Sequence, residues 1–116
     1  MAKLIRTNLK QYQEYQEHKF TKRIINKEKE NVIFLLNFSP GAELPAHRHP
    51  NANVYILVLN GEGVITSDGA DVLVKSGDVI HIDGEEMLSF QNGAESYSSL
   101  YVVLTKIPDE QYGFNI

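Results

Sequence analysis

The sequence contains no cysteine, and it has no long apolar run. Without cysteine the chain cannot form disulfides, use a thiolate nucleophile or build a Cys-based zinc or iron–sulfur site. The longest apolar run, residues 54–59, is far shorter than the ~20 residues of a membrane span. No apolar signal-peptide core stands near the N-terminus, so we expect a cytoplasmic protein.

An excess of basic residues is also missing. Eleven Lys and Arg stand against fifteen Asp and Glu, for a net charge of −4. The basic residues are scattered, and the densest charged stretch, residues 27–30, alternates in sign. This balance argues against nucleic acid or an anionic membrane as the main partner.

Short β-rich segments separated by turn residues make up most of the chain. At 116 residues and 42% hydrophobic, we expect a single domain spanning residues 1–116. The predicted strands are 22–26, 32–38, 46–49, 54–59, 63–66, 71–75, 78–82, 88–91 and 100–105. Turn signals rich in Gly, Asn and Asp lie between them. Strands at this spacing predict an all-β sandwich or barrel.

The two ends of the chain differ from the middle. Leu9, Tyr12 and Tyr15 or Gln16 recur at helical spacing after Thr7 or Asn8, either of which is a suitable cap, and this predicts a short helical or irregular segment before the first strand. The hydrophobic tail 106–116 is expected to pack across the barrel or a partner. Because residues 32–36 and 54–59 are apolar on both faces, a second layer or a homodimer partner is expected to cover the outside.

His47-Arg48-His49 is the most informative motif. In an extended strand alternate side chains share a face, so the two histidines point the same way and Arg48 points to the other. Two converging imidazoles form half of a typical site for a first-row divalent metal.

The spacing around this motif resembles the cupin superfamily. Residues 41–63, with Gly41, the histidine pair and Asn60-Gly61, are similar to the first cupin motif, and residues 77–92 are similar to the second. The resemblance implies a double-stranded β-helix, a jelly-roll barrel that holds a metal or small ligand inside. It also implies a range of activities, from dioxygenases, isomerases and decarboxylases to proteins that only bind ligands.

The chain departs from the usual cupin metal site, which the resemblance gives as two histidines and a glutamate from the first motif and a third histidine from the second. His47 and His49 match the first two positions. The glutamate position falls on Asn53, or on Val54, and the third histidine position falls on Leu88. The familiar site is therefore incomplete.

Two residues elsewhere are candidates to replace the missing ligands. A site of His47, His49, His81 and Glu86 has ligand chemistry suited to zinc, iron, manganese or nickel. The alternatives are that the histidine pair is a remnant of a lost site, that His81 is satisfied locally or at a subunit contact, and that Glu86 is a solvated loop residue.

Candidate ligand-binding residues are Asn53, Tyr55, Phe90 and Tyr101, with core packing as the alternative for the aromatic residues. One interpretation is a small cupin barrel that binds a divalent metal, a small organic ligand, or both in the lumen. The other is a metal-dependent enzyme of dioxygenase or isomerase type acting on a sugar acid, keto acid or phenolic compound. The sequence assigns no catalytic residue, although His49 or His81 would suit a general base.

Overall fold

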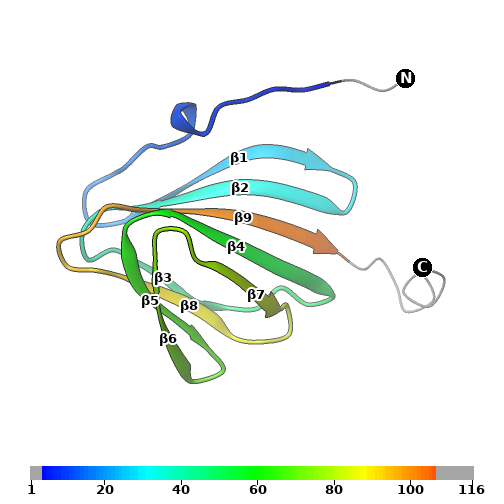
Figure 1. Ribbon diagram of the computed structural model, residues 1–116. Coiled ribbons are helices and arrows are strands. Elements are labelled where there is room, and N and C mark those ends of the chain that lie inside the picture. Colours follow the sequence, from blue (N-terminus) through cyan, green and yellow to red (C-terminus); the bar gives the residue numbers. More distant parts are fainter. Residues whose placement is uncertain (1–3, 107–116) are drawn as a thin grey trace.

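Nine antiparallel strands in two facing sheets form the computed structural model, which describes residues 4–106 (Figure 1). The five-stranded sheet has the order β1-β2-β9-β4-β7, and the four-stranded sheet has the order β3-β8-β5-β6. The bounds of the strands are β1 Phe20–Glu28, β2 Asn31–Phe38, β3 Glu43–His47, β4 Ala52–Asn60, β5 Glu62–Ser67, β6 Ala70–Lys75, β7 Val79–Asp83, β8 Leu88–Asn92 and β9 Ser98–Lys106. Each of the nine predicted strands overlaps a strand of the structure, so the all-β prediction is confirmed. The predicted strand 46–49 is shifted, because β3 ends at His47 and leaves His49 in the following loop.

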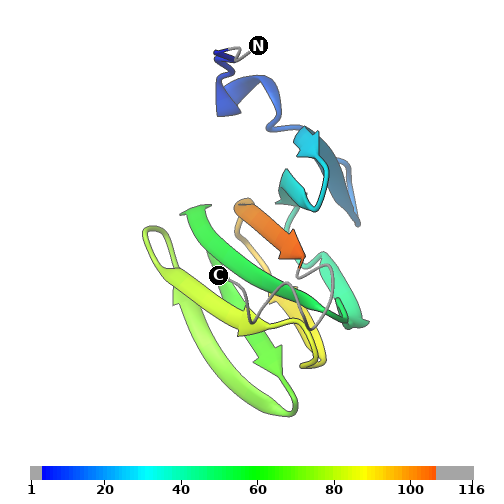
Figure 2. The same cartoon turned by 90° about the vertical axis from the view of Figure 1, so that its right-hand side faces the viewer.

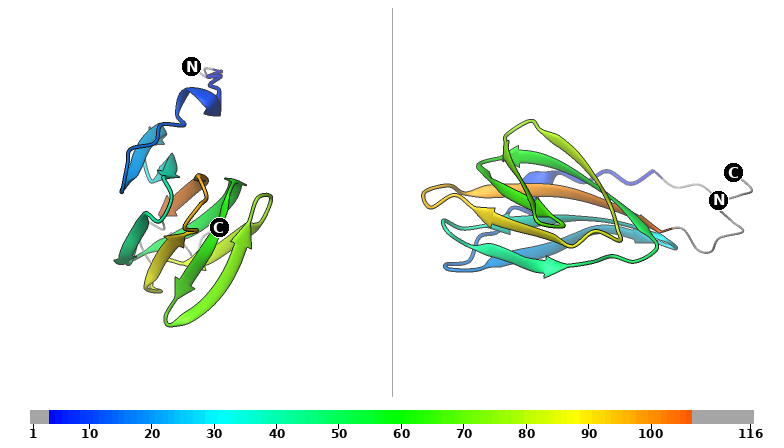
Figure 3. Two further views of the ribbon diagram at one scale, coloured as in Figure 1. Left: turned by 90° about the vertical axis from the view of Figure 1, so that its left-hand side faces the viewer. Right: turned by 90° about the horizontal axis from the view of Figure 1, so that it is seen from below.

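Strand alternation directs one face of each sheet into a shared core. In β4 the buried Val54, Ile56 and Val58 alternate with less buried residues, as expected for strands with one face in the core. Phe38 of one sheet meets Phe90 of the other with ring centroids 4.7 Å apart. The core therefore lies between the two sheets. Figures 2 and 3 show the two sheets from the side and from below.

The hairpin turn between β5 and β6 illustrates how local chemistry sets the register. Asp68 and Gly69 both have positive φ, at 48° and 84°, which is typical of a two-residue turn that matches strand twist. The hairpin pairs Ser67 with Ala70 on either side of this turn.

The segment before β1 covers part of the outer face of the five-stranded sheet. It contains one 3₁₀ turn, Leu9–Gln11, whose cap Asn8 accepts a hydrogen bond from the Lys10 backbone N–H at 2.9 Å. Beyond it, Asn37 Nδ2 donates to the Tyr12 carbonyl at 2.8 Å, and Asn37 itself is completely buried. This segment thus supplies some of the outer cover that the two-faced apolar strands required.

Two further expectations from the sequence concern a membrane span and the C-terminal tail. No helix within residues 4–106 is long and apolar enough to cross a membrane. The packing expected of the hydrophobic tail falls on residues 107–116, which lie outside the described part.

Candidate functional site

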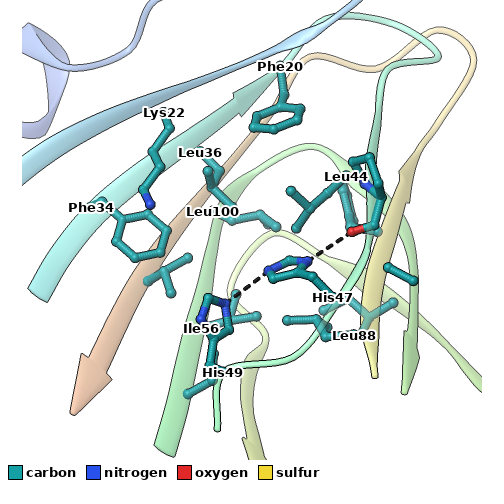
Figure 4. A pocket seen from close by; sticks show the side chains of 16 residues that line it. Phe20, Lys22, Phe34, Leu36, Leu44, His47, His49, Ile56, Leu88 and Leu100 are labelled. Atoms are coloured by element: carbon teal, nitrogen blue, oxygen red, sulfur yellow. Dashed lines mark hydrogen bonds between the residues drawn. The ribbon is translucent and has the colours of Figure 1, made fainter. Parts of the chain in front are cut away.

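A pocket of about 330 Å³ opens between the two sheets, and we call it the lumen pocket (Figure 4). Both sheets and the loop after β3 contribute to its wall. It is lined by Phe20, Lys22, Phe34, Leu36, Leu44, Pro45, Ala46, His47, His49, Val54, Ile56, Ile65, Leu88, Phe90, Leu100 and Val102. Most of this wall is aliphatic or aromatic, as in many small-molecule sites.

A bulge in β3 positions His47. The pairing of β3 with β8 shifts register between Leu44 and His47, with Pro45 inside the irregular stretch. Proline has no N–H for a ladder, so edge strands and bulges are where it is tolerated, and β3 is an edge strand. The bulge leaves the Pro45 carbonyl 2.9 Å from His47 Nδ1.

That contact determines which nitrogen of His47 faces the pocket. Since a carbonyl oxygen only accepts, His47 Nδ1 must carry a proton and donate. In the neutral ring Nε2 is then an acceptor, and it lies 2.9 Å from His49 Nε2. The two rings meet edge to face, with centroids 4.6 Å apart and an interplanar angle of 84°. The sequence prediction that the two histidines share a face thus agrees with their common place in the lumen pocket.

The turn between β7 and β8 holds His49, which lies beyond the end of β3. The His49 backbone N–H donates to the Gly84 carbonyl at 2.8 Å, and the Gly84 N–H donates to the Ala52 carbonyl at 2.9 Å. A Cβ atom at Gly84 would collide with the carbonyl oxygens of both His49 and Ala52. Arg48 is exposed and donates from Nε to the Glu85 carbonyl at 3.0 Å, so it points away from the pocket as expected.

The other two candidate metal ligands lie elsewhere. His81 pairs with Tyr55 across β7 and β4, and the two rings stack with centroids 4.6 Å apart on the exposed side of the sheet. Strand alternation causes this placement, because the buried Ile82 next to His81 takes the inward direction. Glu86 accepts a hydrogen bond from Ser67 Oγ, outside the residues that line the pocket.

The donor set is therefore smaller than the four residues proposed from the sequence. Within residues 4–106, no three His, Cys, Asp or Glu side chains gather closely enough to hold a metal ion. Leu88 stands directly across the β3–β8 pair from His47 and is buried. An aliphatic side chain thus faces the pocket where the second cupin motif usually carries its histidine. A tightly held ion usually needs three or four protein ligands, so these residues do not fit a conventional resident metal.

Of the four candidate ligand-binding residues, Phe90 lines the lumen pocket. Asn53 and Tyr55 alternate with the buried Ala52, Val54 and Ile56, so they lie on the outer face of β4. Tyr101 alternates with Leu100 and Val102 in the same way and lines a depression under the N-terminal segment. The sequence placed the aromatic residues on strands, but it did not determine which face each occupies, because that depends on strand register.

Sequence reasoning missed Lys22. It lies on β1 opposite Leu36, lines the lumen pocket, and places its ammonium 4.5 Å from the centroid of the Phe34 ring (Figure 4). A signal was present, because Phe20, Lys22 and Ile24 occupy alternate positions and share one face of a strand. A single charged residue on an otherwise apolar face is a recognisable pattern.

Comparison with known proteins accounts for this architecture. A family model described as a cupin domain matches residues 34–104, which is more than half of the chain. The chain belongs to the cupin family. The double-stranded β-helix expected from the two motifs is confirmed, and the matched range begins after β1, so Lys22 lies outside it.

Other cupins resemble this chain at low identity. The oxalate-binding protein of Thermotoga maritima is 33% identical over 64 residues, which cover 55% of this cupin and 53% of that protein. The chain thus matches about half the length of this curated relative. An RmlC-like cupin from Desulfovibrio desulfuricans superimposes with a TM-score of 0.79 at 21% identity, over 89% of this chain and 97% of that one. A predicted oxalate decarboxylase from Thermotoga maritima gives a TM-score of 0.71 at 22% identity, over 76% and 81% of the two chains. At these identities the structures share the fold alone.

Proposed function

We propose that this cupin binds a small organic molecule in its lumen pocket, with His47 and His49 as the polar anchors. The observation that carries the proposal is a pair of imidazoles in contact within an otherwise largely apolar pocket of about 330 Å³. Few precisely placed polar groups in an apolar concavity are typical of small-molecule sites. The name of the Thermotoga maritima relative, an oxalate-binding protein, supports the same class of function.

The histidine pair has the right chemistry for this role. Each ring nitrogen is a donor or an acceptor according to its proton, so the pair offers both to an incoming polar group. The Pro45 carbonyl holds His47 Nδ1 as a donor and leaves Nε2 directed at the partner ring. A ligand that replaces the contact between the two rings would keep both imidazoles hydrogen-bonded, so the cost of breaking that contact is offset.

A metal-dependent enzyme is the second candidate, and one observation favours it. Histidines that bind metals commonly donate from the other ring nitrogen to a carbonyl, as His47 does to Pro45. An ion held by both Nε2 atoms, which lie 2.9 Å apart, would have two nitrogen ligands of the kind that zinc and other first-row metals take in proteins. With two protein donors, such an ion would need the organic ligand to complete its coordination, so we place ligand binding first.

The test compares two variants that remove imidazoles of the same kind from different places. His47→Gln/His49→Gln removes both imidazoles from the lumen pocket, whereas His81→Gln removes an exposed imidazole from the outer face of the sheet. Protein purified without chelator is assayed for metal per chain, and small organic acids are then screened by thermal shift with and without zinc, iron, manganese or nickel. A saturating ligand should raise the wild-type Tm by at least about 5 °C. The rise should persist in His81→Gln and vanish in the double variant.

The outcomes separate the two candidates. A ligand that acts without metal supports the binding protein, while near-stoichiometric metal lost in the double variant supports the metal-dependent enzyme. An equal rise in Tm in the wild type and the double variant would place the ligand outside the lumen and contradict both. A cytoplasmic location and a homodimer, expected from the sequence, remain predictions of the same proposal.

A further inference from the structure

The polar side chains that line the lumen pocket are Lys22, His47 and His49. From them we infer that the natural ligand is a small organic anion, a carboxylate attached to an apolar body, and that Lys22 determines this specificity. The inference deepens the proposed function and rests on it. It concerns β1, which precedes the part of the chain that matches the cupin family model.

The positive charge beside the pocket is the first reason to expect an anionic ligand. Among the described residues that line it, none is Asp or Glu, and Lys22 supplies a permanent positive charge. The Lys22 ammonium lies over the face of the Phe34 ring, 4.5 Å from its centroid. A cation over an aromatic ring gains about 1 kcal/mol or less at an exposed site, which is less than a charge-assisted hydrogen bond to a carboxylate offers.

The neighbouring residue shows the contrast. Arg23, the next residue on β1, points to the opposite face and pairs with Glu14 at 2.7 Å. Arg23 is therefore paired within the chain, while Lys22, which is exposed to solvent, lies beside a pocket wall without a carboxylate. An anionic ligand would provide the missing counter-charge.

The apolar part of the pocket wall indicates that the ligand has an apolar body. Phe20, Phe34 and Phe90 line the pocket together with aliphatic side chains from both sheets. Figure 4 shows Phe34 beside Lys22 and Leu44 on the far side of the histidines. Oxalate has no C–H surface, so it would leave this wall without an apolar partner, whereas an aromatic or branched aliphatic carboxylate would bury its body there.

The volume agrees with such a ligand. A cavity of about 330 Å³ corresponds to about eleven water molecules at ~30 Å³ each. Benzoate and isovalerate are both small enough to fit within this volume, and each has a neutral amide of nearly the same shape. These pairs isolate the charge of the ligand from its fit.

The experiment measures binding of benzoate, benzamide, isovalerate, isovaleramide and oxalate by titration calorimetry. We expect at least one of the two monocarboxylates to bind about tenfold more tightly than its own amide, since a hydrogen bond to a charged group contributes more than a neutral one. Lys22→Gln should weaken the carboxylate by about tenfold and leave the amide unchanged. Lys27→Gln removes the same charge from an exposed position of β1 outside the pocket wall and should leave all affinities unchanged.

A second measurement tests the location without any variant. Addition of benzoate should shift the imidazole NMR signals of His47 and His49 and leave those of the exposed His81 in place. Equal affinity for acid and amide, with shifted His47 and His49 signals, would overturn the anion inference and leave the proposed function standing. Binding that leaves the His47 and His49 signals unmoved would overturn both. Oxalate binding more tightly than benzoate and isovalerate, or no binding by any probe, would also overturn the inference.

Discussion

A single aliphatic residue separates this pocket from a three-histidine site. Leu88 is paired with His47 across β3 and β8, and side chains directly opposite on antiparallel strands lie about 5 Å apart at Cβ. Both line the lumen pocket, and Leu88 is 4% exposed. The same position therefore contributes to the apolar wall and excludes a third donor.

Leu88→His should convert the pair into a three-nitrogen site. The new imidazole would stand across from His47, so Zn²⁺ or Co²⁺ affinity should rise by at least about tenfold, or about 1.4 kcal/mol. The folded apoprotein should lose about 2 kcal/mol of unfolding free energy, because a polar imidazole replaces a buried aliphatic side chain. Metal titration and urea unfolding measure the two effects. Adding His47→Gln to this variant should abolish the gain in metal affinity, and a gain that survived would show that the new histidine binds metal without the pair.

The elements around the pocket show how a loop can hold a functional side chain as firmly as a strand. His49 lies after β3, yet its backbone is bonded to the β7–β8 turn, which is bonded in turn to β4. The carbonyl oxygens of His49 and Ala52 both approach Gly84 more closely than any side chain there would permit. The absence of a Cβ atom at Gly84 therefore contributes to the placement of the second imidazole.

Gly84→Ala should disturb that placement. We expect a loss of about 2–3 kcal/mol of unfolding free energy from overpacking, together with weaker binding of lumen ligands. Gly77→Ala is the matched control, because Gly77 has open space around its Cβ position but a φ of +96°, which costs about 1 kcal/mol. Urea unfolding and the ligand titrations measure both variants. Unchanged ligand affinity in folded Gly84→Ala would show that the turn does not position His49.

The alternation of apolar residues and the turn residues were sufficient to predict the strands and their order along the chain. The residues that line the pocket could be predicted only in part. The spacing of His47 and His49 predicted a shared face from strand alternation. Both rings do line the lumen pocket, but His49 lies beyond β3, and its backbone bond to Gly84 holds it there. Whether His81 and Tyr55 faced the lumen depended on the register of β7 against β4, which no local pattern determines. The alternation around Lys22 marked it as a charge on an otherwise apolar strand face, but that β1 packs beside the pocket depends on contacts between strands, which no local pattern determines.

At the scale of the whole molecule, an apolar surface remains open on the outer face of the five-stranded sheet. In register across β9, β4 and β7 lie Tyr101 and Leu57, which line the depression under the N-terminal segment, and Val79 beyond them; the next row is Val103, Tyr55 and His81. Val79 is 73% exposed and Tyr55 is 41% exposed. Contiguous apolar rows of this kind are characteristic of interaction surfaces, and a C₂ dimer brings the same patch of two copies together.

A second copy of the chain is the partner we predict for this surface, as the sequence suggested from its two-faced apolar strands. Light scattering should give the mass of a dimer at micromolar concentration for the wild type. Tyr55→Glu/Val79→Glu should give a folded monomer, because burying two carboxylates against their own copies costs several kcal/mol. Leu73→Glu is the control, since Leu73 is 83% exposed but lies on β6 of the other sheet. If Leu73→Glu disrupts the dimer and Tyr55→Glu/Val79→Glu does not, the interface lies on the four-stranded sheet. A monomeric wild type would show that the outer face of the five-stranded sheet needs no partner.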